Sequence, residues 1–215
     1  MRKPPAPPAW LEPAVREAAG DGHNIIKCPA WRALARCKPI MGRKALCERW
    51  SSYHAGTPPN ATWSDAELAL RLMVEKAAFY ATHQCRAATK AEVEEVDAEY
   101  RKRATQLREV ATKLRGETWQ EALEHAAAIE AAAAFCEEQA DMVWGQFAFT
   151  PGLLAPRNQG DLFVRGYCVT LAEATREIYG KELRGIVAEV TNCAMGITTV
   201  TDQRVRDWLS GGSGV

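Results

Sequence analysis

Several features are missing from this sequence, and each absence narrows the class of protein. The chain has 215 residues but no Cys-x-x-Cys pair, and its seven cysteines are scattered. Met1-Arg2-Lys3 leads into proline-rich sequence and not into an apolar run. The most apolar windows, 68–81 and 126–135, carry charged residues. We therefore expect a cytoplasmic protein with reduced thiols, no signal peptide and no membrane-spanning helix.

Motifs for catalysis are missing as well. The chain has no Gly-x-Ser-x-Gly, no Ser-x-x-Lys, no P-loop and no dinucleotide-binding fingerprint. Cys85, Cys136 and Cys168 fall on apolar helical faces, where a thiolate is disfavoured. His125 lacks the Glu-x-x-His spacing of a di-iron bundle. We predict a non-enzymatic protein with no catalytic residues, no metal and no cofactor.

An excess of either charge is also missing. Lys plus Arg and Asp plus Glu both total 27, so the formal net charge is zero. This balance does not indicate a globally basic nucleic-acid binder, although a local basic patch remains compatible with it. Hydrophobic residues make up 47% of the chain, enough for one sizeable core or for a domain with an extended hairpin.

Helix-starting patterns, by contrast, are plentiful. Capping-box sequences occur at Ser64–Glu67, at Thr89–Glu92 and at Thr118–Glu121, each followed by apolar-periodic sequence. Gly116 stands where a glycine would end the second helix. The fold class predicted from these patterns is all-α, with a long antiparallel helical hairpin and flanking short helices in a helical bundle.

The two helices of the expected hairpin carry apolar seams. In the helix over 90–115, Arg103 interrupts a heptad a/d pattern, and Ala104 and Ala111 widen the apolar face. The a/d positions, which we also consider a self-association seam, are Val93, Val96, Tyr100, Leu107, Val110 and Leu114. The seam of the helix over 119–144 comprises Trp119, Ala122, Ala126, Ile129, Ala133, Cys136, Ala140 and Val143.

Local composition also predicts the division of the chain. Residues 1–13 form a proline-rich flexible arm, and residues 14–63 form a basic helical segment. The long helical hairpin spans 64–149 and a small C-terminal helical subdomain spans 150–209, with a flexible tail over 210–215. Within the C-terminal part, Gly180 and Gly196 should each end a helix, and Thr201 should cap the last one.

One segment has a strong local charge. It carries a formal charge of +6 between residues 27 and 49, from seven cations and Glu48. Arg and Lys pair with phosphates and Trp offers a stacking face, so the segment could bind nucleic acid or another anion. Alternatively, its cations pair with acidic residues within 92–99. The candidate site residues are Lys27, Trp31, Arg32, Arg36, Lys38, Arg43, Lys44, Arg49 and Trp50.

The same region holds several thiols. Cys28, Cys37 and Cys47 lie near His23 and His54 in sequence. A zinc site usually begins from a closely spaced cysteine pair, and here the cysteines are separated by eight and nine residues. Isolated cysteines are more often small buried apolar residues, so we predict no metal site from them.

The C-terminal quarter resembles known sequences. The stretches Arg165–Tyr167, Ile178–Leu183, Val187–Ala188, Asn192 and Thr201–Arg206 are similar to the C-terminal part of uncharacterised helical proteins encoded by bacteriophages and prophages. The resemblance implies a bacterial host cell as the setting. It implies no activity and no site residues.

The leading functional prediction is a helical protein–protein interaction or scaffold protein that self-associates. The helix after Ser64 is apolar on most sides, and the hairpin seam is long, so the apolar surface should exceed what one monomer covers. The expected partner is another protein, including a second copy of this chain, and no membrane is expected. The alternative is a nucleic-acid-binding accessory or regulatory protein that uses the basic segment.

Overall fold

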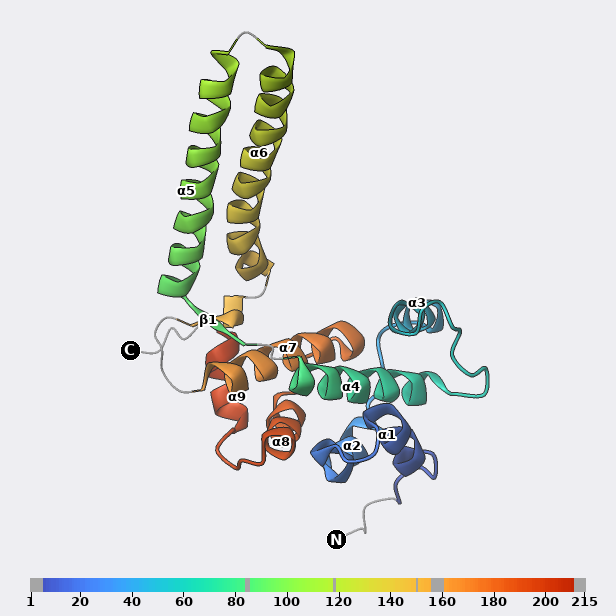
Figure 1. Cartoon of the computed structure of the whole chain (residues 1–215). Coiled ribbons are helices and arrows are strands. Elements are labelled where there is room, and N and C mark those ends of the chain that lie inside the picture. Colours follow the sequence, from blue (N-terminus) through green and yellow to red (C-terminus); the bar gives the residue numbers. More distant parts are fainter. Residues whose placement is uncertain (1–5, 84–85, 118, 150, 156–160, 211–215) are drawn as a thin grey trace. The chain divides into compact units, whose positions relative to one another are not determined.

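The computed structural model describes residues 6–83, 86–117, 119–149, 151–155 and 161–210, although not the side chains of 146–149 and 151 (Figure 1). The chain divides into two compact units. The first, which we call the core unit, comprises Met1–Ala87 and Gly160–Val215, and the second, the hairpin unit, comprises Ala88–Gln159. The predicted all-α class is confirmed, since helices dominate the described residues of both units. Within that part of the chain, no helix has the length and apolar character needed to cross a bilayer.

The core unit consists of helices joined by loops (Figure 1). Its N-terminal part contains α1 (Leu11–Ala19), the 3-10 helix η1 (Asn24–Lys27), α2 (Ala30–Leu34), α3 (Arg43–Tyr53) and α4 (Asp65–Thr82). Its C-terminal part contains α7 (Leu162–Tyr179), α8 (Arg184–Met195) and α9 (Asp202–Leu209).

Local polar groups and glycines define the ends of these helices, largely as predicted. The Ser64 hydroxyl accepts from the Glu67 N–H at 3.2 Å, and the Thr201 hydroxyl caps α9. Gly180 and Gly196 end α7 and α8 in the left-handed conformation, with φ of 73° and 65°. Because a side chain disfavours positive φ, glycine is the residue that stops these two helices at little cost.

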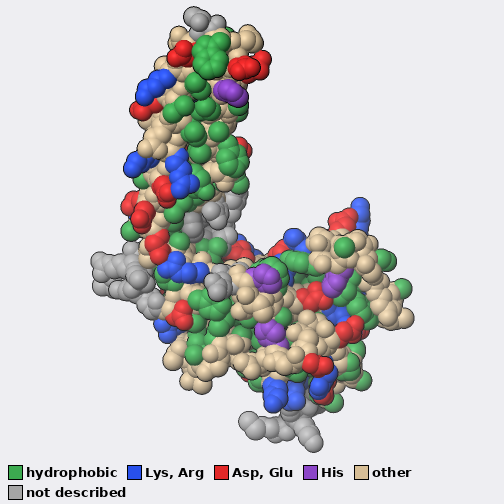
Figure 2. All heavy atoms as spheres, viewed as in Figure 1, with side chains coloured by type: hydrophobic (Ala, Val, Ile, Leu, Met, Phe, Trp, Pro, Cys, Tyr) green, Lys and Arg blue, Asp and Glu red, His purple; other side chains and the backbone are tan. Residues whose placement is uncertain are grey.

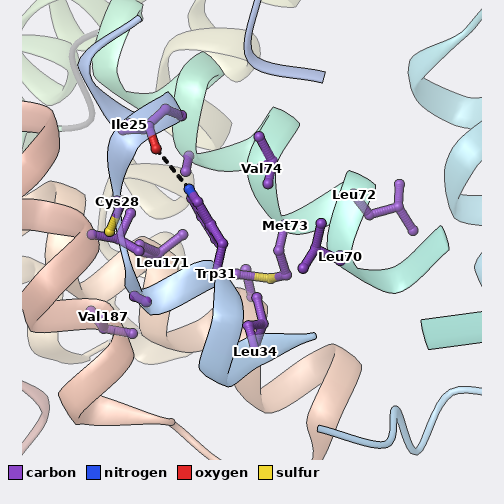
Figure 3. Close-up of a cluster of buried hydrophobic side chains, with 14 of the residues drawn as sticks. Ile25, Cys28, Trp31, Leu34, Leu70, Leu72, Met73, Val74, Leu171 and Val187 are labelled. Atoms are coloured by element: carbon purple, nitrogen blue, oxygen red, sulfur yellow. Dashed lines mark hydrogen bonds between the residues drawn. The ribbon is translucent and has the colours of Figure 1, made fainter. Parts of the chain in front are cut away.

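Helix α4 is the centre of the core unit. Five of its large apolar side chains are at most 1% exposed, and they pack among residues of α2, α7 and α8 (Figure 3). The Tyr167 hydroxyl of α7 donates to the Ala77 carbonyl of α4 at 3.1 Å. The apolar surface that we expected α4 to leave open is thus mostly covered within one chain, and this reason for self-association is wrong. The five side chains are Leu68, Leu70, Leu72, Met73 and Val74.

The division of the chain differs from the predicted one. Residues 64–149 do not form a single hairpin, because α4 belongs to the core unit. Helices α7 to α9 also belong to that unit and do not form a separate C-terminal subdomain. The physical reason is that a helix buried on nearly all sides needs several neighbours, which come from both ends of the chain.

The hairpin unit begins with a short parallel pairing of β1 (Ala88–Thr89) with β2 (Leu154–Ala155). Between these strands lie α5 (Lys90–Arg115), α6 (Gln120–Phe149) and the 3-10 helix η2 (Pro151–Leu153). Thr89 and Glu92 form the complete predicted capping box at the start of α5. Thr118 of the third predicted box lies outside the described residues.

Alanines form the contact line between α5 and α6. Six of them are at most 1% exposed, so the two helices approach closely along a seam with a heptad repeat. Val96 and Val110 were expected in this seam, but they are 40% and 45% exposed, and Trp119 is 57% exposed. Small side chains occupy the centre of the seam because they permit the close approach of the two helices. The six are Ala104, Ala111, Ala122, Ala126, Ala133 and Ala140.

Candidate functional site

The first tryptophan of the predicted basic site is a core residue. Trp31 is 2% exposed, and its indole N–H donates to the Ile25 carbonyl at 2.7 Å (Figure 3). Its ring lies near Leu34, Met73 and Leu171 among the buried side chains shown there. A buried ring cannot stack on a nucleic-acid base, so the predicted role of Trp31 is wrong.

The second tryptophan of that site is also buried. Trp50 is 8% exposed, stacks on the His54 ring at a centroid distance of 3.8 Å and meets the edge of Trp63 at 5.0 Å. Its indole N–H has no hydrogen-bond partner among the residues that the structure describes. The predicted stacking role of Trp50 is therefore wrong as well.

The cations of the basic segment fall into two groups. Lys27, Arg32, Arg36 and Lys38 are exposed on or after η1 and α2. Three others are paired within the core unit: Arg43 with Asp65, Lys44 with Glu48, and Arg49 with Glu177. Internal pairing thus occurs for these three, although not with the acidic residues of 92–99 that we expected. Acidic residues of 92–99 form ion pairs within their own helix, as Glu94 does with Lys90 and Glu99 with Arg103.

The cysteines of this region do not converge on one point. Cys28 is buried, whereas Cys37 and Cys47 are half-buried on other elements. Burial raises the pKa of the Cys28 thiol, with a further contribution from neighbouring Cys193. Over the described ranges, there is no group of three or more His, Cys, Asp or Glu side chains that could hold a metal ion.

A groove between α1 and α3, with α4 as its floor, brings together residues that are far apart in sequence. Figure 1 shows α1 and α3 on opposite sides of α4. We call it the aromatic groove, and its volume is about 400 Å³. It is lined by Glu17, Ala18, Tyr53, His54, Glu75, Lys76, Phe79 and Tyr80.

A histidine–carboxylate pair lies in this groove. The His54 Nε2 atom is 3.0 Å from a Glu75 carboxylate oxygen. The Trp50 ring supports His54 on one face, so the imidazole is held in place. Burial raises the pKa of the Glu75 carboxyl, while His54 opposes that shift. The pair therefore forms a polar wall of the groove beside the rings of Tyr53, Phe79 and Tyr80.

Beside this pair lies a buried lysine. The Lys76 side chain is 7% exposed, and its Nζ atom is 3.3 Å from Glu177 and 5.7 Å from the centre of the Tyr53 ring. Burial and the neighbouring Arg49 lower the pKa of Lys76 to about 8. Because Arg49 pairs with the same Glu177 carboxylate, Lys76 has only a shared counter-charge.

Sequence reasoning did not identify the aromatic groove. Its lining comes from three helices, so no single window of sequence contains it. One indication was available: Glu75 and Lys76 interrupt the apolar run 68–81. Charged residues inside an apolar helix that is mostly buried must find partners, and such places are frequent sites of function.

The hairpin unit presents a second surface of interest, and one edge of it is charged. Three arginines of α5, one heptad apart, pair across to acidic residues of α6. The residue numbers of the paired side chains increase along α5 while they decrease along α6, so the two helices are antiparallel. The pairs are Arg101 with Asp141, Arg108 with Glu137 and Arg115 with Glu130.

The other side of the hairpin is apolar. Arg108 and Glu137 each lie four residues after a seam alanine, Ala104 and Ala133. Leu107 and Cys136 each lie three residues after the same alanines, which places them on the opposite side of the contact line. Figure 2 shows hydrophobic side chains along the hairpin. We call this surface the apolar face, and its residues are Val96, Tyr100, Leu107, Val110, Leu114, Ile129, Cys136 and Val143.

The predicted self-association seam is divided by this geometry. Val93 is 3% exposed and belongs to the interior of the hairpin. Tyr100, Leu107 and Leu114 are half-buried, and Val96 and Val110 are exposed. Five of the six residues therefore contribute to a surface that another molecule can reach.

Comparison of the chain with protein-family models, with curated proteins and with solved structures finds no match in any of the three.

Proposed function

We propose that this chain is a helical interaction protein that self-associates through the apolar face of its hairpin unit. The observation that carries the proposal is the asymmetry of the hairpin. One edge is closed by three ion pairs between α5 and α6, whereas the opposite side leaves large apolar side chains accessible. A continuous strip of exposed and half-buried apolar side chains is typical of interfaces between proteins.

A second copy of the same hairpin is the partner that fits this face best. Apolar residues recur at heptad spacing on both helices, as at Leu107 and Leu114 on α5 and at Ile129, Cys136 and Val143 on α6. A helical pair with this spacing packs on another pair of equal length and spacing to form a four-helix bundle. The resemblance of the C-terminal quarter to phage and prophage proteins supports a bacterial host cell as the setting.

The test is the oligomeric state of the full chain. Sedimentation velocity should give more than one copy per particle for the wild-type chain. The double variant Val96→Glu/Val110→Glu places two carboxylates on exposed positions of the apolar face, and it should weaken association at least about tenfold because these charges would lose water on burial.

A matched control is available on the other side of α5. Thr105 and Thr112 are exposed and one heptad apart, and they lie on the ion-pair side of the contact line. Thr105→Glu/Thr112→Glu adds the same charge and should leave association unchanged. A wild-type chain that remains monomeric at the highest concentration reached, or two variants that behave alike, would contradict the proposal.

Nucleic-acid binding by the basic segment is the second candidate. Lys27, Arg32 and Lys38 are exposed and form no ion pair within the described part of the chain, and this favours contact with an anion. Retention on heparin that falls steeply with salt, and that is lost in Lys27→Ser/Arg32→Ser/Lys38→Ser, would support it. The burial of Trp31 and Trp50 leaves such binding without base stacking.

A further inference from the structure

We infer that the aromatic groove of the core unit binds a proline-rich segment with a basic flank, and that its occupant is the Arg2–Pro8 segment of a second copy of this chain. The groove lies in the core unit, so this inference is independent of the apolar face of the hairpin. It assigns a peptide-binding site to helices α1, α3 and α4.

The first step concerns the exposed rings. Large apolar side chains that are exposed in the described part of the core unit are Ile40, Tyr53 and Phe79. Tyr53 and Phe79, at 46% and 49% exposure, both line the groove. The other described aromatic side chains of the core unit are buried or half-buried, so its two most exposed rings lie at one place.

The second step concerns the rigidity of these rings. Phe79 stacks on His83 at a centroid distance of 3.9 Å and meets the edge of Tyr80 at 5.9 Å. The Lys76 ammonium group lies 5.7 Å from the centre of the Tyr53 ring. Rings that are already held by neighbours lose little conformational entropy when a ligand packs on them, so the groove is preorganised for binding.

The third step concerns charge. Glu17 at the rim is 66% exposed, and it shares the single buried guanidinium of Arg71 with Glu67. Glu75 pairs with His54 and also feels the nearby charge of Arg71, and the Lys76 ammonium group pairs with Glu177. The ionised groups of the groove and their partners are four carboxylates and three cations, so the formal charge is −1 with His54 neutral. They are Glu17, Glu67, Glu75, Glu177, Arg49, Arg71 and Lys76.

An aromatic groove with an acidic rim matches one kind of peptide particularly well. Polyproline II segments dock on exposed aromatic rings, since the proline rings pack flat on them and the segment needs little ordering on binding. A cation beside the prolines complements an acidic rim. The sequence Arg2-Lys3-Pro4-Pro5-Ala6-Pro7-Pro8 has both properties.

The geometry favours the segment of a second copy over that of the same chain. Ala6 and Pro7 are exposed, and the Pro8 carbonyl accepts from the Leu11 N–H at the start of α1. The groove is lined by Glu17 and Ala18, at the other end of that helix. The segment would have to reverse direction at Ala9 to reach its own groove, whereas a neighbouring copy can deliver it directly.

The experiment is a titration of a fluorescently labelled peptide, Met1–Ala9, with the full chain, followed by anisotropy. Saturable binding is expected. Tyr53→Ala and Phe79→Ala should each weaken it at least about tenfold, because each removes an aromatic contact at the centre of the site. Both side chains are about half exposed, so the fold should tolerate their loss, and circular dichroism checks this. Phe135→Ala, at a ring that is 58% exposed in the hairpin unit, is the matched control and should have no effect.

Further peptide variants separate the contribution of the prolines from that of the basic residues, and a variant of the full chain removes competition by its own proline-rich segment. A peptide with its prolines replaced by alanine should bind at least about tenfold more weakly, and one with Arg2 and Lys3 replaced by Glu should also lose affinity. A full chain in which Pro4, Pro5, Pro7 and Pro8 are alanine carries no competing segment, and it should bind the labelled peptide at least as tightly as the wild type. Absence of saturable binding to both chains, or binding that ignores Tyr53 and Phe79, would overturn the inference. Loss of hairpin association alone would leave it intact.

Discussion

The buried ammonium group of Lys76 allows a sharp test of the core unit. Its side chain is 7% exposed, and burial together with Arg49 lowers its pKa from 10.5 to about 8. The Lys76 ammonium group pairs with the Glu177 carboxylate at 3.3 Å, but the same carboxylate also pairs with Arg49. Charged Lys76 therefore costs the folded state free energy, and Lys76→Met removes the charge while it keeps most of the apolar stem.

The size and sign of the effect follow from the two pKa values. Their difference corresponds to about 3 kcal/mol, since one pKa unit is equivalent to about 1.36 kcal/mol. Near pH 7 both the folded and the unfolded state hold the proton, so the folded state carries the full cost. As the pH rises from about 8 to about 10.5, the folded state releases the proton first, so the unfolded state binds more protons and the free energy of unfolding increases with pH.

The assay is urea unfolding of the wild type and of Lys76→Met at a series of pH values. We expect the free energy of unfolding of the wild type, relative to that of the variant, to increase by about 3 kcal/mol between about pH 7 and about pH 10.5. Burial raises the pKa of the thiols of Cys28 and Cys168 and of the Tyr179 hydroxyl, and these groups lower stability in alkaline solution. Because both proteins contain them, their effect cancels in the difference.

The control for this experiment is Lys38→Met. Lys38 is exposed and has no ion pair within the described ranges, so the difference between the wild type and this variant should be flat across the same pH range. A difference for Lys76→Met that is equally flat, or that falls with pH, would refute the conclusion that Lys76 is buried with an incompletely compensated charge.

Two further substitutions test the packing of the two units. Trp31→Phe should lower the free energy of unfolding by about 2 kcal/mol in urea, because it loses the hydrogen bond to Ile25 and leaves part of the site empty; a change under about 0.5 kcal/mol would mean that the indole is not held as described. Ala133→Leu in the closely packed seam should cost about 2 kcal/mol by overpacking, measured by thermal melting of the helical circular dichroism signal. The control Ala128→Leu, at an exposed position of α6, should melt as the wild type does, and equal melting of both variants would contradict the close helix approach.

Helix termini were the part of the fold that could be predicted best. The caps at Ser64, Thr89 and Thr201 and the stops at Gly180 and Gly196 were all read correctly. These features depend on hydrogen bonds and backbone angles within a few residues, and so a short window of sequence contains the necessary information.

The register of the hairpin was predicted only in part. A heptad pattern in α5 was visible, but Val96 and Val110 were placed at the centre of the seam, and Ala104 and Ala111 were expected only to widen it. Hydrophobicity ranks Val above Ala, whereas close packing of two helices selects the smaller residue. The alanines of the partner helix α6, Ala126, Ala133 and Ala140, bring the two helices close together, and this determines that the alanines of α5 and not Val96 and Val110 lie at the centre of the seam.

The candidate sites depended even more on the partner elements. The sequence around Trp31 and Trp50 is compatible both with rings that stack on a ligand and with rings that fill a core. The two rings are buried because α4 and Trp63 pack against them, and this packing is not visible in the sequence. Likewise, the pairing of Lys76 with Glu177 joins residues 101 positions apart.

The sequence by itself determined the all-α class, the helix termini and the existence of a long helical pair, since these depend on interactions between residues close along the chain. Tertiary structure alone decided that α4 is enclosed by both ends of the chain, which face of the hairpin stays open, and that Tyr53 and Phe79 meet in one groove. Burial is a property of several elements at once, and a single helix carries its apolar pattern without specifying what will cover it.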